Sequence, residues 1–500
     1  MRLNKKTIIK DYNYLKLKAN KLSTQGKYNQ SLSYIKAASK IANHLNFRYA
    51  DDDLEELLNL ISAKLLQPER RIFDKDTFVF YDSFGLDNRG LTQQYIRALI
   101  SWNKQFIYIL DNDGQLDSSN NILEELKNYS RCTIEIIPTS YSDTEKIKHI
   151  AEIIHVYKPS KAFLHFAPYN VVGVCVFNVF PTIKRYLINL TDHAFWLGKS
   201  CADYFIEFRE YGYNISVKHR GIPEDKIRIQ NYYPIQQKNK FEDFPIDVSN
   251  KVVLFSGGAY YKIYGEKMKF LYLIKRVLSE NKNAILLIAG WGNDSPLKQF
   301  IVENDLENQI VLLGSRKDIN EVFKNSDLYL ATYPFSGGLM AQFAAVHNTN
   351  IMAYSKKDLP FNFIEGLLKL PKEVKLTFSN EEDYHDEANK LIQNKEYRHR
   401  KSEDLNNSIL TELQFNQQLN KLIYSTRVKH QLNHDCDIEV DRVFNLYLET
   451  ENNFIRNYYI FIFTSIRMNI FSNFKIAFRF VFDLLFYRND LILNKMPSKK

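Results

Sequence analysis

The chain has few cysteines and no long apolar run, and both scarcities exclude classes of protein. Its 500 residues include four cysteines, none of them in a CxxC pair, which argues against a disulfide framework and a zinc site. No run of about 18 uncharged apolar residues occurs, so no transmembrane helix is expected. The basic N-terminus lacks the apolar core of a signal peptide. We therefore expect a cytoplasmic protein.

Nucleic-acid motifs are missing as well, although the chain is basic. A formal charge of +9 at pH 7 favours anionic partners such as nucleotide phosphates, anionic lipid or nucleic acid. The basic residues do not cluster outside the C-terminal tail, and no RNA- or DNA-binding motif occurs. We expect no nucleic-acid partner.

The length predicts several domains, because 500 residues are too many for one core. Residues 8–66 have helical periodicity, and segment 26–37 resembles one tetratricopeptide-like hairpin. A stable array needs about three copies, and no second copy follows, so a helical cap and a docking hairpin both stay open. We divide the chain into residues 1–70, 75–245, 250–395 and 396–500.

From residue 77 onward, short apolar strands alternate with helices. We expect strands at 77–81, 105–110, 132–137, 161–166 and 185–190, with helices at 91–102, 119–129, 143–157 and 172–182. After a polar break at 245–250, further strands are expected at 251–255, 284–289, 309–313, 327–331 and 350–354. This alternation predicts an α/β protein with two parallel, Rossmann-like sheets covered on both faces. Residues 380–430 are expected to be helical.

Stretch 327–342 is the most informative piece of the chain, because it reads as a buried strand, a tight glycine turn and a helix. Glycines let the backbone approach a ligand, and the N–H groups of a first helical turn attract an anion. We assign a diphosphate to the backbone N–H groups of Ser336, Gly337, Gly338 and Leu339. Ligands bind at the carboxyl ends of strands in open α/β sheets, and the other predicted strand ends carry Gly257, Gly258, Gly290 and Gly314.

The C-terminal tail, residues 442–493, alternates aromatic and aliphatic clusters with single basic residues. Between 455 and 487 Asp483 is the sole acidic residue. Basic, aromatic-rich amphipathic helices can lie in a membrane interface. The alternative is a helical subdomain packed on the rest of the chain. The tail thus leaves open a peripheral position on the inner face of a membrane.

Four ordered stretches carry a resemblance to a known family: VVLFSGG, AILLIAGWG, IVLLGSRKDINEVFKNSDLYL and YPFSGGLMAQFAAVHNTNI. They look like the successive nucleotide-sugar-binding stretches of GT-B glycosyltransferases. Over residues 75–430 the chain resembles this class, and most nearly the bacterial enzymes of surface-polysaccharide assembly, of capsule or O-antigen type. The resemblance implies two Rossmann-like domains, an N-terminal helical hairpin and a helical C-terminal tail. It also implies a nucleotide-sugar donor and neither metal nor other cofactor, and no DxD-type acidic cluster follows a predicted strand.

The same resemblance implies roles on the donor side. Lys262 matches the family's phosphate-binding lysine, and Arg316 is placed to supply a second cation or to frame the base through its backbone. Many retaining members carry two glutamates around the late glycine turn, and the second binds the donor ribose. Here no Asp or Glu stands between Tyr333 and Asn350, and Gln342 lies about where that glutamate would fall. Its amide can hydrogen-bond a ribose hydroxyl.

On the acceptor side, stretch 191–198 looks like the acceptor loop of such enzymes. His193 is predicted to act as the base or as an acceptor-positioning group, because a neutral imidazole suits proton transfer near pH 7. Asp192 is adjacent and suits the same role. The first strand-to-helix turn is expected to face acceptor or phosphate with Asn88, Arg89 and Gly90.

These features predict a metal-independent glycosyltransferase. It would move a hexosyl or N-acetylhexosaminyl group from a UDP-linked donor to a glycan, a lipid-linked glycan or another hydroxyl acceptor. Two alternatives stay open. One is a nucleotide-sugar 2-epimerase, which shares the twin-Rossmann design, and the other is a non-catalytic scaffold with the same fold.

Overall fold

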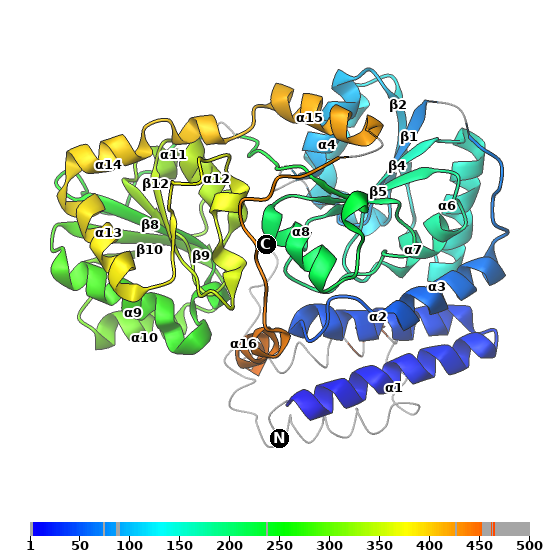
Figure 1. Cartoon of the computed structure of the whole chain (residues 1–500), viewed down its shortest axis with the longest axis horizontal. Helices are drawn as coiled ribbons and strands as arrows, with labels where there is room; N and C mark the ends of the chain where they lie inside the picture. The colour runs from blue at the N-terminus through cyan, green and yellow to red at the C-terminus, as the bar shows by residue number, and fades with distance from the viewer. Residues whose placement is uncertain are drawn as a thin grey trace.

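Two α/β domains stand side by side in the computed structural model, with a helical layer under the N-terminal one (Figure 1). The structure describes residues 4–73, 76–86, 91–236, 239–425, 428–452, 462, 464 and 465. The N-terminal domain is built on residues 76–229 and the C-terminal domain on residues 252–402. Each domain has its own parallel sheet, which confirms the predicted fold class.

Three helices precede the first sheet: α1 (Lys5–Thr24), α2 (Tyr28–Leu45) and α3 (Asp52–Leu65). The side chains of Asn4 and Asp51 accept hydrogen bonds from backbone N–H groups in the first turns of α1 and α3, as N-caps do. Leu58 of α3 belongs to the same buried cluster as Val174, which lies on a helix of the N-terminal domain. The helical region therefore packs as a cap on that domain.

The N-terminal sheet consists of β1 (Thr77–Asp82), β2 (Gln105–Leu110), β3 (Cys132–Ile136), β4 (Lys161–His165), β5 (Lys184–Asn189), β6 (Tyr204–Glu207) and β7 (Ile227–Ile229). Their order is β3-β2-β1-β4-β5-β6-β7, and every pairing is parallel. The connecting helices are α4 (Leu91–Ser101), α5 (Asn120–Lys127), α6 (Asp143–Tyr157), α7 (Val171–Asn178) and α8 (Glu210–Lys218).

The five strands expected in this domain are present, and two more were missed. β6 has four residues and ends at the buried Glu207, and β7 has three residues around the buried Arg228. A charged residue inside so short a run removes the apolar pattern that marks a strand. The sequence signal was therefore too weak to show either strand.

The C-terminal sheet consists of β8 (Val252–Ala259), β9 (Ala284–Trp291), β10 (Ile310–Gly314), β11 (Leu328–Leu330), β12 (Asn350–Tyr354) and β13 (Thr377–Phe378). The order is β10-β9-β8-β11-β12-β13, and all these strands are parallel. The helices are α9 (Gly265–Glu280), α10 (Ser295–Glu303), α11 (Ile319–Lys324), α12 (Gly338–Val346), α13 (Glu381–Gln393) and α14 (Lys395–Ser402). Residues 266–268 at the start of α9 have left-handed backbone angles.

One local prediction for this domain was wrong. We expected the strand at 251–255 to end in a glycine turn at 256–258, but β8 continues through that stretch to Ala259. Gly257 pairs with Ala289 and Gly258 with Gly290 in β9. Both strands carry small residues here, so nothing prevents the ladder from continuing.

In the part of the chain that the structure describes, two crossings lead from one domain to the other. Its described part from 230 to 251, without helix or strand, leads into the C-terminal domain. Leu405 belongs to a core cluster of the C-terminal domain and Leu410 to one of the N-terminal domain, so the return crossing lies between them. It leads to α15 (Glu412–Tyr424), which packs against α4.

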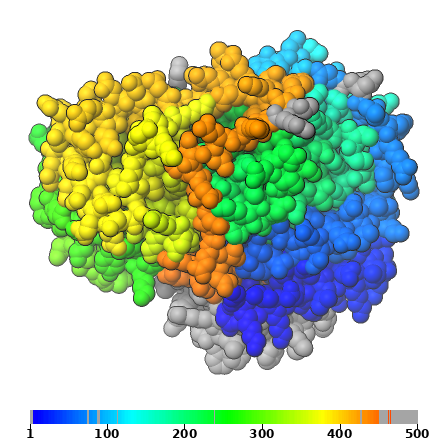
Figure 2. Space-filling view, in the orientation of Figure 1, coloured from blue at the N-terminus to red at the C-terminus, as the bar shows by residue number. Residues whose placement is uncertain are grey.

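The segment after α15 runs along the junction of the two domains, as Figure 2 shows in orange. It ends in α16 (Val440–Asn452), which contacts both α2 and α9. Residues 453–493 of the basic, aromatic tail lie outside the described residues except 462, 464 and 465. Within the described ranges, no helix is long and apolar enough to cross a bilayer.

Candidate functional site

The glycine turn at 336–338 stands where β11 gives way to α12. Gly337 is the N-cap of α12 and Gly338 its first residue. The first hydrogen bonds of this turn run from Met340 N and Ala341 N to Gly337 O, at 3.0 and 3.3 Å. The N–H groups of Gly338 and Leu339 come before them and have no acceptor inside the helix. They give this end of α12 the partial positive charge that attracts an anion.

Lys262 reaches the same turn from the end of β8. It lies in the 3-10 helix η4 (Tyr260–Ile263), and its Nζ donates to Ser336 O at 3.4 Å. A Cβ at Gly258 would lie 3.6 Å from Lys262 Cδ, and a Cβ at Gly337 would lie 4.0 Å from Nζ. The structure thus brings together Gly258, Lys262, Ser336 and Gly337, which the sequence separates by almost eighty residues.

Gly257 in β8 and Gly290 in β9 allow close packing beside this lysine. A Cβ at Gly290 would lie 2.2 Å from Gly258 O and 2.7 Å from the ring of Tyr260. A Cβ at Gly257 would lie 3.2 Å from Met340 Cε in α12. Both glycines therefore serve the close packing of β8, β9 and α12 around the turn.

An exposed tryptophan at this edge was not singled out from the sequence. Trp291 is the last residue of β9, pairs with Ala259 and is 65% exposed. It lies between Gly290 and Gly292, and its strand partner Ala259 precedes Lys262 by three residues. The two flanking glycines, at a predicted strand end, were the available signal in the sequence.

Gln342 does not have the setting predicted for a ribose ligand. Its side chain is 1% exposed, and Nε2 donates to Tyr232 O at 2.8 Å and to Leu367 O at 3.2 Å. A Cβ at Gly338 would lie 2.8 Å from the hydroxyl of Tyr232. The amide therefore acts as a core group that ties α12 to residues outside it, and the ribose role is not supported by this arrangement.

Arg316 is also committed elsewhere. Its guanidinium forms a two-point ion pair with the buried Asp318, at 2.7 and 2.6 Å, and donates to Asp243 O at 2.9 Å. The side chain fixes the incoming crossing segment instead of offering a second cation to phosphate. Gly314 ends β10 with a φ of +66°, which favours glycine at that turn.

On the other domain, Asp192 and His193 follow β5. Asp192 is fully buried, and its carboxylate accepts from Arg209 Nε at 2.5 Å and Nη2 at 3.2 Å. His193 Nδ1 lies 3.3 Å from Asp192 Oδ1, and the imidazole is 45% exposed. Burial alone would raise the pKa of Asp192, but the charge of Arg209 and the hydrogen bonds lower it below its ordinary value. Asp192 is therefore a poor base, and it orients His193 instead.

Arg209 carries this pair to the domain junction. Its Nη1 donates to Phe361 O at 3.0 Å, on the C-terminal domain. The ring of Phe361 lies 6.0 Å from that of Phe335, which directly precedes the glycine turn, and 6.1 Å from that of Tyr211. A continuous set of contacts thus joins the Asp192 pair to the turn at 336–338.

No family model matches the sequence, and no curated protein matches it either. Among solved structures, HepE of Anabaena with bound UDP and glucose is 13% identical; the match covers 69% of this chain and 99% of HepE, with a TM-score of 0.50. The O-GlcNAc transferase of Thermobaculum terrenum is 12% identical over 86% of this chain and 79% of its own, also with a TM-score of 0.50. TarM of S. aureus is 9% identical over 70% and 100%, with the same TM-score.

The chain has the GT-B fold. The fold that the four short sequence stretches implied is therefore confirmed. At such low identities the likeness concerns the fold alone, so the roles of individual residues rest on the geometry above.

A second Asp–His pair lies at the same edge of the N-terminal sheet of this GT-B protein. Asp82 ends β1 and His165 ends β4, with Nδ1 3.0 Å from Asp82 Oδ1. They are 0% and 3% exposed, and the ring of Phe84 lies 4.7 Å from that of His165. Asp82 also accepts from the hydroxyl of Tyr108 at 2.8 Å. The pair braces neighbouring strands, whereas the His193 imidazole is open to solvent.

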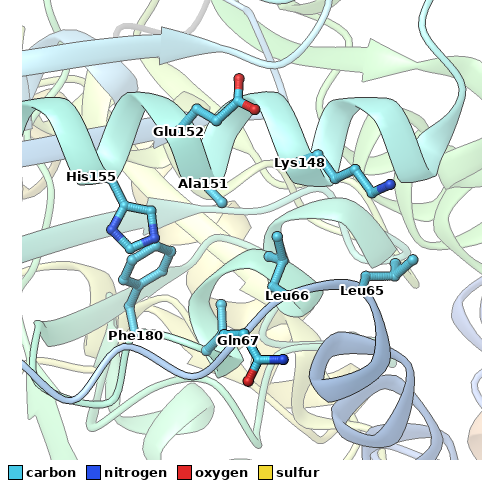
Figure 3. Close-up of a pocket in the computed structure, with 9 residues that line it drawn as sticks. Leu65, Leu66, Gln67, Lys148, Ala151, Glu152, His155 and Phe180 are labelled. Atoms are coloured by element: carbon cyan, nitrogen blue, oxygen red, sulfur yellow. The ribbon is translucent and has the colours of Figure 1, made fainter.

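Two hollows in the described part of this GT-B protein are not lined by any of these residues. A cavity of about 490 Å³ lies between the domains, bordered by Glu210, Gly366 and His430 among others. The groove in Figure 3 is lined by His155, Phe180 and the chain after α3. His155 precedes β4 and Phe180 precedes β5, so this groove lies at the amino edge of the sheet, opposite His193.

The remaining acceptor-side prediction concerns Asn88, Arg89 and Gly90, which lie outside the described residues. Across the part of the chain that the structure describes, no three His, Cys, Asp or Glu side chains gather closely enough to hold a metal ion.

Proposed function

We propose that this protein is a glycosyltransferase with a nucleotide-sugar donor, and that the donor is UDP-linked. The observation that carries the proposal is that the Lys262 amino group lies 3.4 Å from Ser336 O, in the turn that leads directly into α12. A lysine and a helix N-terminus together offer the positive charge that a departing diphosphate needs. The GT-B neighbours with bound UDP agree with this choice of donor.

The proposed reaction transfers a sugar to a hydroxyl group. The acceptor oxygen forms a bond to the anomeric carbon, while the bond from that carbon to the diphosphate oxygen breaks. His193 is the proposed base: with Nδ1 facing Asp192, its Nε2 is left to take the hydroxyl proton. Lys262 and the α12 N–H groups receive the leaving charge, so no metal ion is required for this step.

The acceptor that we propose is a glycan or a lipid-linked glycan, and the transferred group is a hexosyl or N-acetylhexosaminyl residue. The support is the basic, aromatic composition of 455–487, which suits the surface of an anionic membrane. Retention of the full chain on vesicles with anionic lipid, but not on neutral vesicles, tests the membrane part. Equal binding to both would remove it.

The donor proposal is tested by calorimetry with UDP, UDP-glucose and UDP-N-acetylglucosamine. We expect at least one of them to bind and to raise the melting temperature. His193→Ala is expected to keep nucleotide affinity and to lose transfer to a hydroxyl acceptor. Full transfer by this variant would remove His193 from the base role.

The same assay separates the alternatives. Epimerisation at C2 of the free nucleotide sugar, followed by NMR without any acceptor, would favour a 2-epimerase. Absence of nucleotide binding in the folded protein would favour a scaffold. We expect neither, because a lysine beside a helix N-terminus supports the binding of a diphosphate.

A further inference from the structure

The loop that carries His193 is held by the N-terminal helices. Residues 191–200 follow β5 and lie against α2 and α3. Asn43 of α2 donates from Nδ2 to Phe195 O at 2.8 Å, and Phe195 N donates to Asn46 Oδ1 at 3.2 Å. One side chain of α2, Asn43, and the side chain of its C-cap, Asn46, therefore pair with the backbone C=O and N–H groups of Phe195.

Glu55 of α3 holds the far end of the same loop. Its carboxylate accepts from Gly198 N at 2.7 Å, Lys199 N at 3.1 Å and Ser200 N at 3.0 Å, and from the Ser200 hydroxyl at 2.6 Å. Glu55 is buried, with 5% of its surface exposed. Gly198 has a φ of +125°, a backbone angle that favours glycine.

Arg220 holds the start of the 191–200 loop and also contacts the N-terminal helical region. Its Nη2 donates to Asp192 O at 2.9 Å and to Ala194 O at 2.8 Å. The guanidinium lies 5.4 Å from the ring centre of Tyr49, which connects α2 to α3. His193 thus sits between two backbone carbonyls fixed by Arg220, on a loop whose later part is fixed by Asn43 and Glu55.

We propose that the N-terminal helical region is a positioning element for the acceptor loop, and that Glu55 is its principal positioning residue. This rests on the proposed function of His193. Charge-assisted hydrogen bonds are stronger than neutral ones, and a reacting group displaced by about 1 Å costs roughly 100-fold in rate. The hairpin that the sequence left as a cap or a docking unit therefore acts on the catalytic loop.

Glu55→Gln is the test, with Glu56→Gln as its matched control. Glu56 is the next residue of the same helix and is exposed, so its substitution makes the same chemical change without touching the loop. Glutamine at 55 presents one oxygen and one NH2 group to four donors. We expect the amides of 198–200 to exchange with deuterium at least tenfold faster than in the control.

Activity gives the second readout. In Glu55→Gln we expect kcat to fall 10- to 100-fold, while the Kd for UDP and the KM for the donor stay within twofold. Fast exchange with unchanged kcat would overturn the positioning role. Unchanged exchange at 198–200 would overturn the contact itself, whatever the protein's activity, so the outcome does not depend on the proposed function.

Asn43→Ala is a second variant of the same contact, for the case that Glu55→Gln does not fold. Asn43 is only partly buried, so we expect this variant to fold. We expect a three- to tenfold loss of kcat with unchanged UDP affinity. If both variants fold and transfer at the wild-type rate, the helical region does not position the loop.

Discussion

Two copies of the tripeptide Ser-Gly-Gly flank Lys262, and they fold differently. At 256–258 the tripeptide continues β8 and pairs with β9, whereas at 336–338 it turns the chain from β11 into α12. Ser256 is fully buried and Ser336 is partly exposed. The two copies meet through the lysine, whose stem passes Gly258 and whose amino group reaches Ser336 O.

The difference comes from the residues opposite each copy. β9 offers Ala289 and Gly290 to the first copy, so two rows of small residues continue as paired strands. The second copy follows Pro334, which has no N–H to donate to a neighbouring strand. A glycine pair therefore permits a turn without requiring one.

The largest expected effect is at Gly290, which supports the first copy. In Gly290→Ala the new Cβ would lie 2.2 Å from a backbone oxygen, which cannot move as a side chain can. Overpacking of this kind costs about 3 kcal/mol, and the free energy of unfolding measured with urea should fall by about that much. Gly314→Ala is the control: no atom lies within 4 Å of its Cβ, and its left-handed φ costs about 1 kcal/mol. Equal losses would show that packing does not fix the first copy.

Gly338 tests the second copy in the same way. A Cβ there would lie 2.8 Å from the Tyr232 hydroxyl and 3.1 Å from Leu367 Cδ1. We expect Gly338→Ala to lose about 2 kcal/mol of stability. Because Tyr232→Phe removes the oxygen in the way, the double variant should be more stable than the sum of the two single changes predicts. Strict additivity in thermal denaturation would contradict the contact.

Lys262 tests what the two copies do together. Lys262→Met should weaken UDP binding by about 1.5 kcal/mol, or roughly tenfold, because it removes a charged hydrogen-bond donor. Stability should change little. Lys282→Met is the control, since Lys282 is exposed just before the amino end of β9. If calorimetry finds the same UDP affinity in both variants, Lys262 does not bind the diphosphate.

The smallest effect separates the two copies by backbone angle alone. Gly258 has a φ of +141° and Gly337 a φ of −104°. Alanine at 258 should therefore cost about 1 kcal/mol more than alanine at 337, where the nearest neighbour is the flexible side chain of Met340. If the two variants have the same melting temperature, the backbone angles do not distinguish the copies.

The sequence predicted both sheets and the turn at 336–338, because apolar strands and glycines leave local patterns. The phosphate role of Lys262, expected from an ordered family pattern, stays a prediction; the structure shows that its amino group reaches the turn at Ser336 O. The sequence did not predict the setting of Gln342, whose partners Tyr232 and Leu367 are distant in the chain. Arg316 had its partner Asp318 only two residues away, so this ion pair could have been foreseen. The hold of Glu55 on 198–200 joins residues far apart, which no local pattern records.

The two crossings of the chain constrain how the GT-B domains can separate. One lies at 230–251 and the other between Leu405 and Leu410. A third link lies at α16, which contacts α2 below the N-terminal domain and α9 of the C-terminal domain. Any separation of the two domains would therefore have to break the hydrogen bond from Arg209 Nη1 to Phe361 O, which spans their junction.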